Sequence, residues 1–105
     1  MRNVTELSKL NGKVYVYLKD EMIARRFLQD AEKEGFTFGV GEKPTARPGN
    51  NLYVVNPDQT ISHVGWAGHM AFQSAKYVGE QEMIRVDYEK YLIGEENYVI
   101  NKNNS

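Results

Sequence analysis

The segment from Asp20 to Gly35 constrains the fold more than any other part of the chain. It opens with an aspartate suited to capping a helix and closes with a glycine suited to the left-handed position that ends one. Between them, apolar residues recur at helical spacing and form one stripe, made of Ile23, Phe27, Leu28 and Ala31. We therefore predict one main amphipathic helix, over about residues 20–34, that buries one face.

Strands are predicted on both sides of this helix. Residues 14–18 alternate aliphatic side chains with Tyr15 and Tyr17, the period of two that is typical of a strand with one aliphatic and one aromatic face. Further strands are expected at residues 36–38, 52–55, 60–64, 83–86 and 98–100. Because Pro57 favours a tight turn between two of them, we predict an α+β fold with a small antiparallel sheet and the main helix packed on one face.

Shorter elements are expected near both ends of the chain. Asn3 or Thr5 is expected to cap a helical turn, and Asp87 to cap another that ends at Gly94. Residues 70–77 fit either a helical turn or a strand, and that choice decides where His69 points. We expect residues 1–100 to form a single domain and the tail 101–105 to fray, because the tail has almost nothing to bury.

Composition excludes several classes of protein. The chain has no cysteine, so it forms no disulfide, zinc finger, iron–sulfur cluster or thiol active site, and a cytoplasmic location is expected. No apolar run approaches the ~18 residues of a membrane span. The net charge of −1 argues against a general nucleic-acid binder, which would present a basic face. We therefore expect no contact with membranes and no direct binding of nucleic acid.

The segment from His63 to Met70 holds both histidines, the only tryptophan and two of the nine glycines. Trp66 either packs in the core or binds a partner, since tryptophan is enriched in interface hot spots. His63 and His69 would hold a metal only if the fold added further ligands. The two histidines are not spaced as a helical pair, so we expect a strand histidine and a loop histidine. No metal, no cofactor and no catalytic residue is expected.

Two other regions offer candidate binding residues. The aromatic strand face of Tyr15 and Tyr17 either lies under a helix or contacts a partner. The loop 42–50 carries Lys43 and Arg47, and such cations can receive a phosphate or a carboxylate. The loop lacks the glycine-rich phosphate-loop pattern, so an ordinary solvated loop is the alternative.

Part of the chain resembles a class of small uncharacterised proteins from phages and mobile elements of Firmicutes. The resemblance lies in Lys33-Glu34-Gly35-Phe36-Thr37-Phe38-Gly39, in Lys43-Pro44-Thr45 and in the later hairpin, within residues 13–65. Some of these proteins antagonise host defences, as anti-CRISPR proteins do. The resemblance implies a role of that kind and carries over no catalytic residue.

Together these observations predict a small non-enzymatic binding protein, of the phage-inhibitor type, that occupies a surface of a host defence or nucleic-acid-processing protein. The expected contact residues are Trp66, His69, His63, Arg47, Lys43, Tyr15 and Tyr17. One alternative is a protein that binds a nucleotide or another phosphate-bearing small molecule, for which a homodimer would supply a larger pocket. A second alternative is a histidine-dependent hydrolase.

Overall fold

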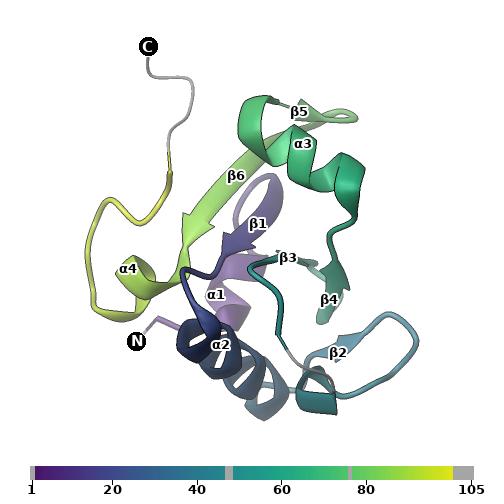
Figure 1. The fold of residues 1–105 in the computed structure, drawn as a ribbon, viewed down its shortest axis with the longest axis vertical. Coiled ribbons are helices and arrows are strands. Elements are labelled where there is room, and N and C mark those ends of the chain that lie inside the picture. Colours follow the sequence, from purple (N-terminus) through teal and green to yellow (C-terminus); the bar gives the residue numbers. More distant parts are fainter. Residues whose placement is uncertain (1, 47–48, 76, 101–105) are drawn as a thin grey trace.

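The computed structural model describes residues 2–46, 49–75 and 77–100. Helices and strands are interspersed along these ranges, as Figure 1 shows. The elements are α1 (Val4–Ser8), β1 (Lys13–Tyr17), α2 (Glu21–Lys33), β2 (Thr37–Phe38), the 3-10 turn η1 (Pro44–Ala46), β3 (Leu52–Val55), β4 (Thr60–His63), α3 (Trp66–Ser74), β5 (Tyr77–Val78), β6 (Gln81–Asp87) and α4 (Tyr88–Leu92). The tail 101–105, which we expect to fray, lies outside the described residues.

The strands form one sheet in the order β2-β4-β3-β1-β6-β5, so the α+β class is confirmed and the sheet is larger than expected. The expectation of an antiparallel sheet needs correction. The pairs β1–β3, β3–β4 and β5–β6 are antiparallel, whereas β1–β6 and β2–β4 are parallel. For the β1–β6 pair, the reason is that the chain crosses one face of the sheet through α3 before it returns as β6, and a crossover of this length permits parallel pairing.

The main helix, α2, begins and ends where its capping residues predict. The side chain of Asp20 accepts a hydrogen bond of 3.0 Å from the amide of Ile23. Gly35 adopts a φ of 86°, and the amide of Phe36 then donates to the carbonyl of Ala31 at 2.9 Å. The left-handed conformation favours glycine because it has no Cβ. Capping residues in the local sequence therefore mark both ends of this helix.

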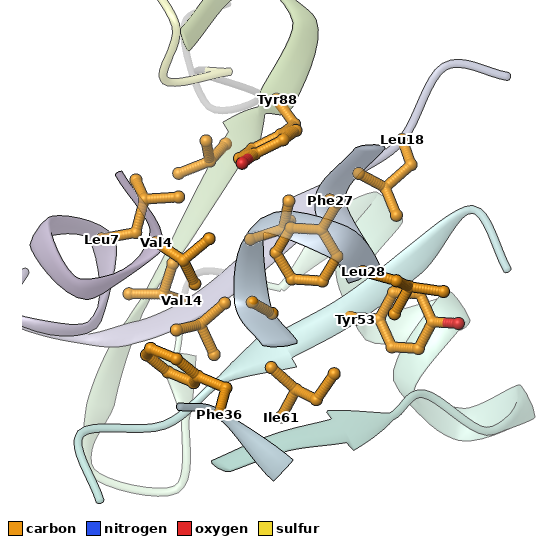
Figure 2. Packing of buried hydrophobic residues seen from close by; sticks show 14 of the residues in the cluster. Val4, Leu7, Val14, Leu18, Phe27, Leu28, Phe36, Tyr53, Ile61 and Tyr88 are labelled. Atoms are coloured by element: carbon orange, nitrogen blue, oxygen red, sulfur yellow. The ribbon is translucent and has the colours of Figure 1, made fainter. Parts of the chain in front are cut away.

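The larger core lies between α2 and one face of the sheet (Figure 2). Phe27 lies at its centre and is fully buried, with its ring centroid 5.6 Å from that of Tyr53 on β3 and 5.1 Å from that of Tyr88 on α4. Val14 and Val16 of β1 belong to the same cluster, so the aliphatic side of this strand faces α2. Helices α1 and α4 also contribute buried residues to it.

The first helix is capped by the residue that precedes it and by one residue far away in the chain. Asn3 caps α1 and accepts a hydrogen bond of 2.8 Å from the amide of Glu6. The carboxylate of Glu34, just after α2, accepts from the amides of Val4 and Thr5 at 3.0 and 2.8 Å. Carboxylates stabilise a helix N-terminus by satisfying its free amides. The predicted helical turn is therefore confirmed, with Asn3 as its cap.

The C-terminal part of the described chain follows the prediction except at its last segment. Asp87 caps α4, and Gly94 has a φ of 87° just after the helix. Residues 98–100 make a single antiparallel bridge, Val86 with Val99, instead of the expected edge strand.

Among the described residues, no helix has both the length and the apolar character that a membrane span needs.

Raising the pH above about 10 is expected to destabilise the protein. Burial raises the pKa of four tyrosines: Tyr15, Tyr53, Tyr88 and Tyr91. For Tyr88 the hydrogen bond to Asp30, 2.6 Å long, adds to the effect of burial. A pKa raised in the folded state contributes stability that is present below the unfolded pKa and is lost as the pH rises towards the folded one.

Denaturant titrations across this range measure the effect. We expect the midpoint to fall as the pH rises from about 9 to about 11, and to fall less steeply in Tyr88→Phe, which removes the group with the largest shift. A midpoint that stays level over this range contradicts the prediction.

Candidate functional site

The two histidines lie on opposite sides of the sheet. His63 ends β4 on the side that faces α2, where its ring stacks on that of Phe38 with centroids 4.4 Å apart. His69 belongs to α3, which covers the other face, so it is a helix residue and not the expected loop residue. The described part of the chain has no cluster of three or more metal-ligating side chains and no ion pair to either histidine. His63 and His69 therefore do not lie together as two ligands of one metal site.

The loop 42–50 binds a carboxylate of the same chain. Glu32 of α2 accepts hydrogen bonds from the amide of Thr45 at 3.2 Å and from its hydroxyl at 2.6 Å. These bonds lower the pKa of Glu32, with a smaller contribution from the charge of Lys43. The donors of Thr45 in this loop are thus already engaged, whereas the groups expected to receive a phosphate were Lys43 and Arg47. Lys43 is exposed beside them, and Arg47 lies outside the described residues.

A hollow of about 470 Å³ lies between α2 and this loop. Glu21 and Arg25 line it together with Leu28, Gln29 and Thr45, so its charged groups have opposite signs. Such a mixed lining shows no preference for an anionic ligand. The hollow therefore adds no support to a phosphate site.

The aromatic side of β1 is covered by α3. Phe72 lies over it, with its ring centroid 6.2 Å from that of Tyr15 and 6.4 Å from that of Tyr17. Tyr15 is only 5% exposed and its burial raises the pKa of the phenol, whereas Tyr17 is half-buried. Of the two alternatives for this face, the structure shows packing under a helix. Tyr15 is thus a core residue in this structure.

Residues 66–74 form a helix whose outer side is apolar and exposed. Trp66 is 79% exposed and Met70 is 52% exposed. Residues four apart lie on the same side of a helix, so these two side chains form one ridge, which we call the α3 ridge. The sequence left open whether Trp66 packs in the core, and the structure places it in solvent.

The inner side of α3 holds the ridge in place. Phe72 and the small residues Ala71 and Ala75 pack on the second core cluster of the sheet. The helix also approaches Val64 closely, because a Cβ on Gly68 would lie 2.5 Å from a methyl carbon of Val64. A glycine at this position therefore lets the start of the helix lie against the end of β4.

A buried arginine secures the other end of this helix. The side chain of Arg85 on β6 is 2% exposed, and its Nε donates to the carbonyl of Phe72 at 2.6 Å. Its Nη2 donates to the carbonyl of Ala75. Burial lowers the pKa of Arg85, and the carbonyls at a helix C-terminus favour a positive charge. We did not predict this role; the only signal in the sequence is a charged residue in the middle of an apolar strand.

Comparison of the chain with protein-family models, with curated proteins and with solved structures finds no match. The most distinctive feature of the chain's geometry is the α3 ridge, an exposed apolar pair on a helix that packs against the sheet.

Proposed function

We propose that this protein is a non-enzymatic binding protein that docks on a larger protein through the α3 ridge. The exposure of Trp66 at 79%, next to Met70 on the same side of the helix, carries the proposal. Burying a large apolar surface lowers the free energy, and a tryptophan left in water does not contribute this stabilisation to the fold. A partner that covers the side chain can gain it on binding. Tryptophan is also enriched among the few residues that supply most of the binding energy of an interface.

The rest of the helix suits this role. α3 contains no Asp, Glu, Lys or Arg, whereas α2 has six charged residues among its 13. A partner that covers α3 therefore desolvates no charged side chain of the helix, and burying an unpaired charge is costly. The contacts of Arg85 and Phe72 fix the helix before binding, so less conformational entropy is lost on association.

The partner class remains the one that the sequence suggests. A host defence or nucleic-acid-processing protein is the first class to test, because the resemblance to phage and mobile-element proteins points to it. We also propose a cytoplasmic location, the host cytoplasm for a phage-encoded protein, which the absence of cysteine supports. The phosphate-ligand alternative has less support, because Glu32 already occupies the amide and hydroxyl of Thr45.

Trp66→Ala is expected to weaken binding to the partner about 30-fold, since a hot-spot residue contributes about 2 kcal/mol or more. The tagged protein is first used to capture the partner from a lysate of cells that make the partner. The two purified proteins are then titrated against each other by calorimetry. Met22→Ala is the matched control, because Met22 on α2 is equally exposed, at 79%, and lies outside the α3 ridge. Circular dichroism checks that each variant is folded.

The proposal is contradicted by binding that does not depend on the α3 ridge. If Trp66→Ala and Met70→Ala both bind the partner as tightly as the unchanged protein, the contact lies elsewhere. A loss of binding in Met22→Ala as large as that in Trp66→Ala would likewise place the contact away from α3.

A further inference from the structure

We infer that α3 is a hinged cover over one face of the sheet. The helix lifts as one unit while the rest of the chain stays folded, and Arg85 is the latch that holds it closed. The structure described above is the closed state, in which the α3 ridge is in place. The inference concerns the inner side of the helix, so it does not depend on what the ridge binds.

The helix α3 is weakly anchored in comparison with the other α-helices of the described chain. None of its nine residues is buried, whereas α1, α2 and α4 each bury two or more. It also lacks the side-chain cap that each of these three helices has at its N-terminus. Segments with few buried apolar contacts open at a lower free energy than the fold as a whole. α3 therefore meets the physical condition for opening by itself.

The surface beneath α3 is buried, although the helix that covers it is not. Phe72 supplies the large apolar side chain of α3 that packs on this surface. The covered residues are no more than 5% exposed and form the second core cluster: Tyr15, Leu52, Val54 and Met83. The larger core, which includes α2, is a separate cluster. Lifting α3 therefore uncovers an apolar strip of the sheet and leaves the larger core in place.

Arg85 acts as the latch at the C-terminal end of the helix. Its Nε and Nη2 donate to the carbonyls of Phe72 and Ala75, and its guanidinium carbon lies 5.6 Å from the centroid of the Phe72 ring. No carboxylate in the described ranges forms an ion pair with it. When α3 lifts, the guanidinium loses these contacts and regains water. Hydration of the charge offsets part of the loss, because keeping an ion out of water is costly.

Gly65 supplies a hinge at the start of the helix. Its backbone is extended, and a Cβ built on it would meet no atom of the described chain within 4 Å beyond its own neighbours. Glycine changes its φ and ψ angles at a lower steric cost than other residues. The helix therefore has space and backbone freedom to swing about this residue.

An introduced thiol reports the opening directly, because the chain has no cysteine. Val54 and Val55 are neighbours in β3 and are 5% and 2% exposed, but Val54 belongs to the cluster under α3 and Val55 to the larger core. Val54→Cys and Val55→Cys are each treated with iodoacetamide, and mass spectrometry follows the labelling. We expect Val54→Cys to react at least about tenfold faster, because its thiol becomes accessible without global unfolding.

Further substitutions in the Val54→Cys protein test the latch. Arg85→Met and Phe72→Ala should each accelerate labelling at least about fivefold, because each removes a contact that closes α3. Trp66→Ala, on the exposed side of the same helix, is the control and should change the rate by less than about twofold. Circular dichroism checks that each variant is folded. The comparison of the two thiols needs neither substitution, so it stands even where Arg85→Met does not fold.

Three results overturn the cover. These are equal labelling rates for the two thiols, a Val54→Cys rate that neither Arg85→Met nor Phe72→Ala raises, and an acceleration by Trp66→Ala as large as that by Phe72→Ala. The first would show that α3 leaves the sheet only when the whole chain unfolds. An acceleration by Phe72→Ala without one by Arg85→Met overturns the role of Arg85 as the latch.

Discussion

Replacing Phe27 with alanine is expected to lower the free energy of unfolding by about 3–5 kcal/mol. Phe27 is fully buried at the centre of the larger core, where its ring contacts those of Tyr53 and Tyr88. Removing it leaves a cavity between α2 and the sheet that rigid neighbouring rings fill poorly. A domain of this size is stable by about 5–15 kcal/mol, so the loss is a large fraction of the total.

Denaturant unfolding measured by circular dichroism gives this change. Met22→Ala in the same helix is the control, because its side chain lies in solvent and the substitution should change stability by less than about 0.5 kcal/mol. A loss below about 1 kcal/mol for Phe27→Ala would contradict the central position of its ring.

Replacing Arg85 with methionine is expected to cost about 2–4 kcal/mol and to loosen α3 specifically. Methionine keeps the aliphatic part of the side chain but donates no hydrogen bond. The carbonyls of Phe72 and Ala75, at the C-terminal end of α3, then lose the hydrogen bonds that the guanidinium of Arg85 donates to them. Because α3 has no buried residue of its own, the loss should be felt there first.

Hydrogen exchange resolves that local effect. In Arg85→Met the amides of residues 66–75 should exchange faster relative to those of α2, as expected when one segment opens without the rest. Arg25→Met, at an exposed position of α2, is the control for removing a positive charge. Uniform acceleration across the whole chain would show that Arg85 stabilises the fold as a whole and does not act on α3 in particular.

Elements with strong local signals could be predicted from the sequence. α2 follows from Asp20, Gly35 and one apolar stripe, and the hairpin of β3 and β4 follows from Pro57. The mixed sheet could not be predicted, because pairing of β1 with β6 depends on contacts between distant residues. The structure of residues 66–74 could not be predicted either, since the spacing of their apolar residues clearly matches neither the period of a helix nor that of a strand.

The candidate site was predictable only in part. Trp66 and His69 mark the segment that forms α3, and the exposure of Trp66 agrees with a binding role. Tyr15 was expected on the aromatic face of its strand. The sequence could not assign this face to solvent or to the core, because nothing in the neighbouring residues shows that α3 lies over it. Arg85 was missed for a related reason: its partners are backbone carbonyls of another element, and carbonyls leave no signal in the sequence.

The place of β1 in the sheet also has a consequence for how the chain is made. Lys13 pairs with Met83 and Tyr17 with Asp87, so each partner lies 70 residues further along the chain. At a synthesis rate of about 5–20 residues per second, the β6 partner of β1 is made about 4–14 s after β1 itself. One edge of β1 stays without its partner strand during this time. An open strand edge is a template for pairing with other chains. The nascent chain is therefore most prone to aggregation before residues 81–87 leave the ribosome.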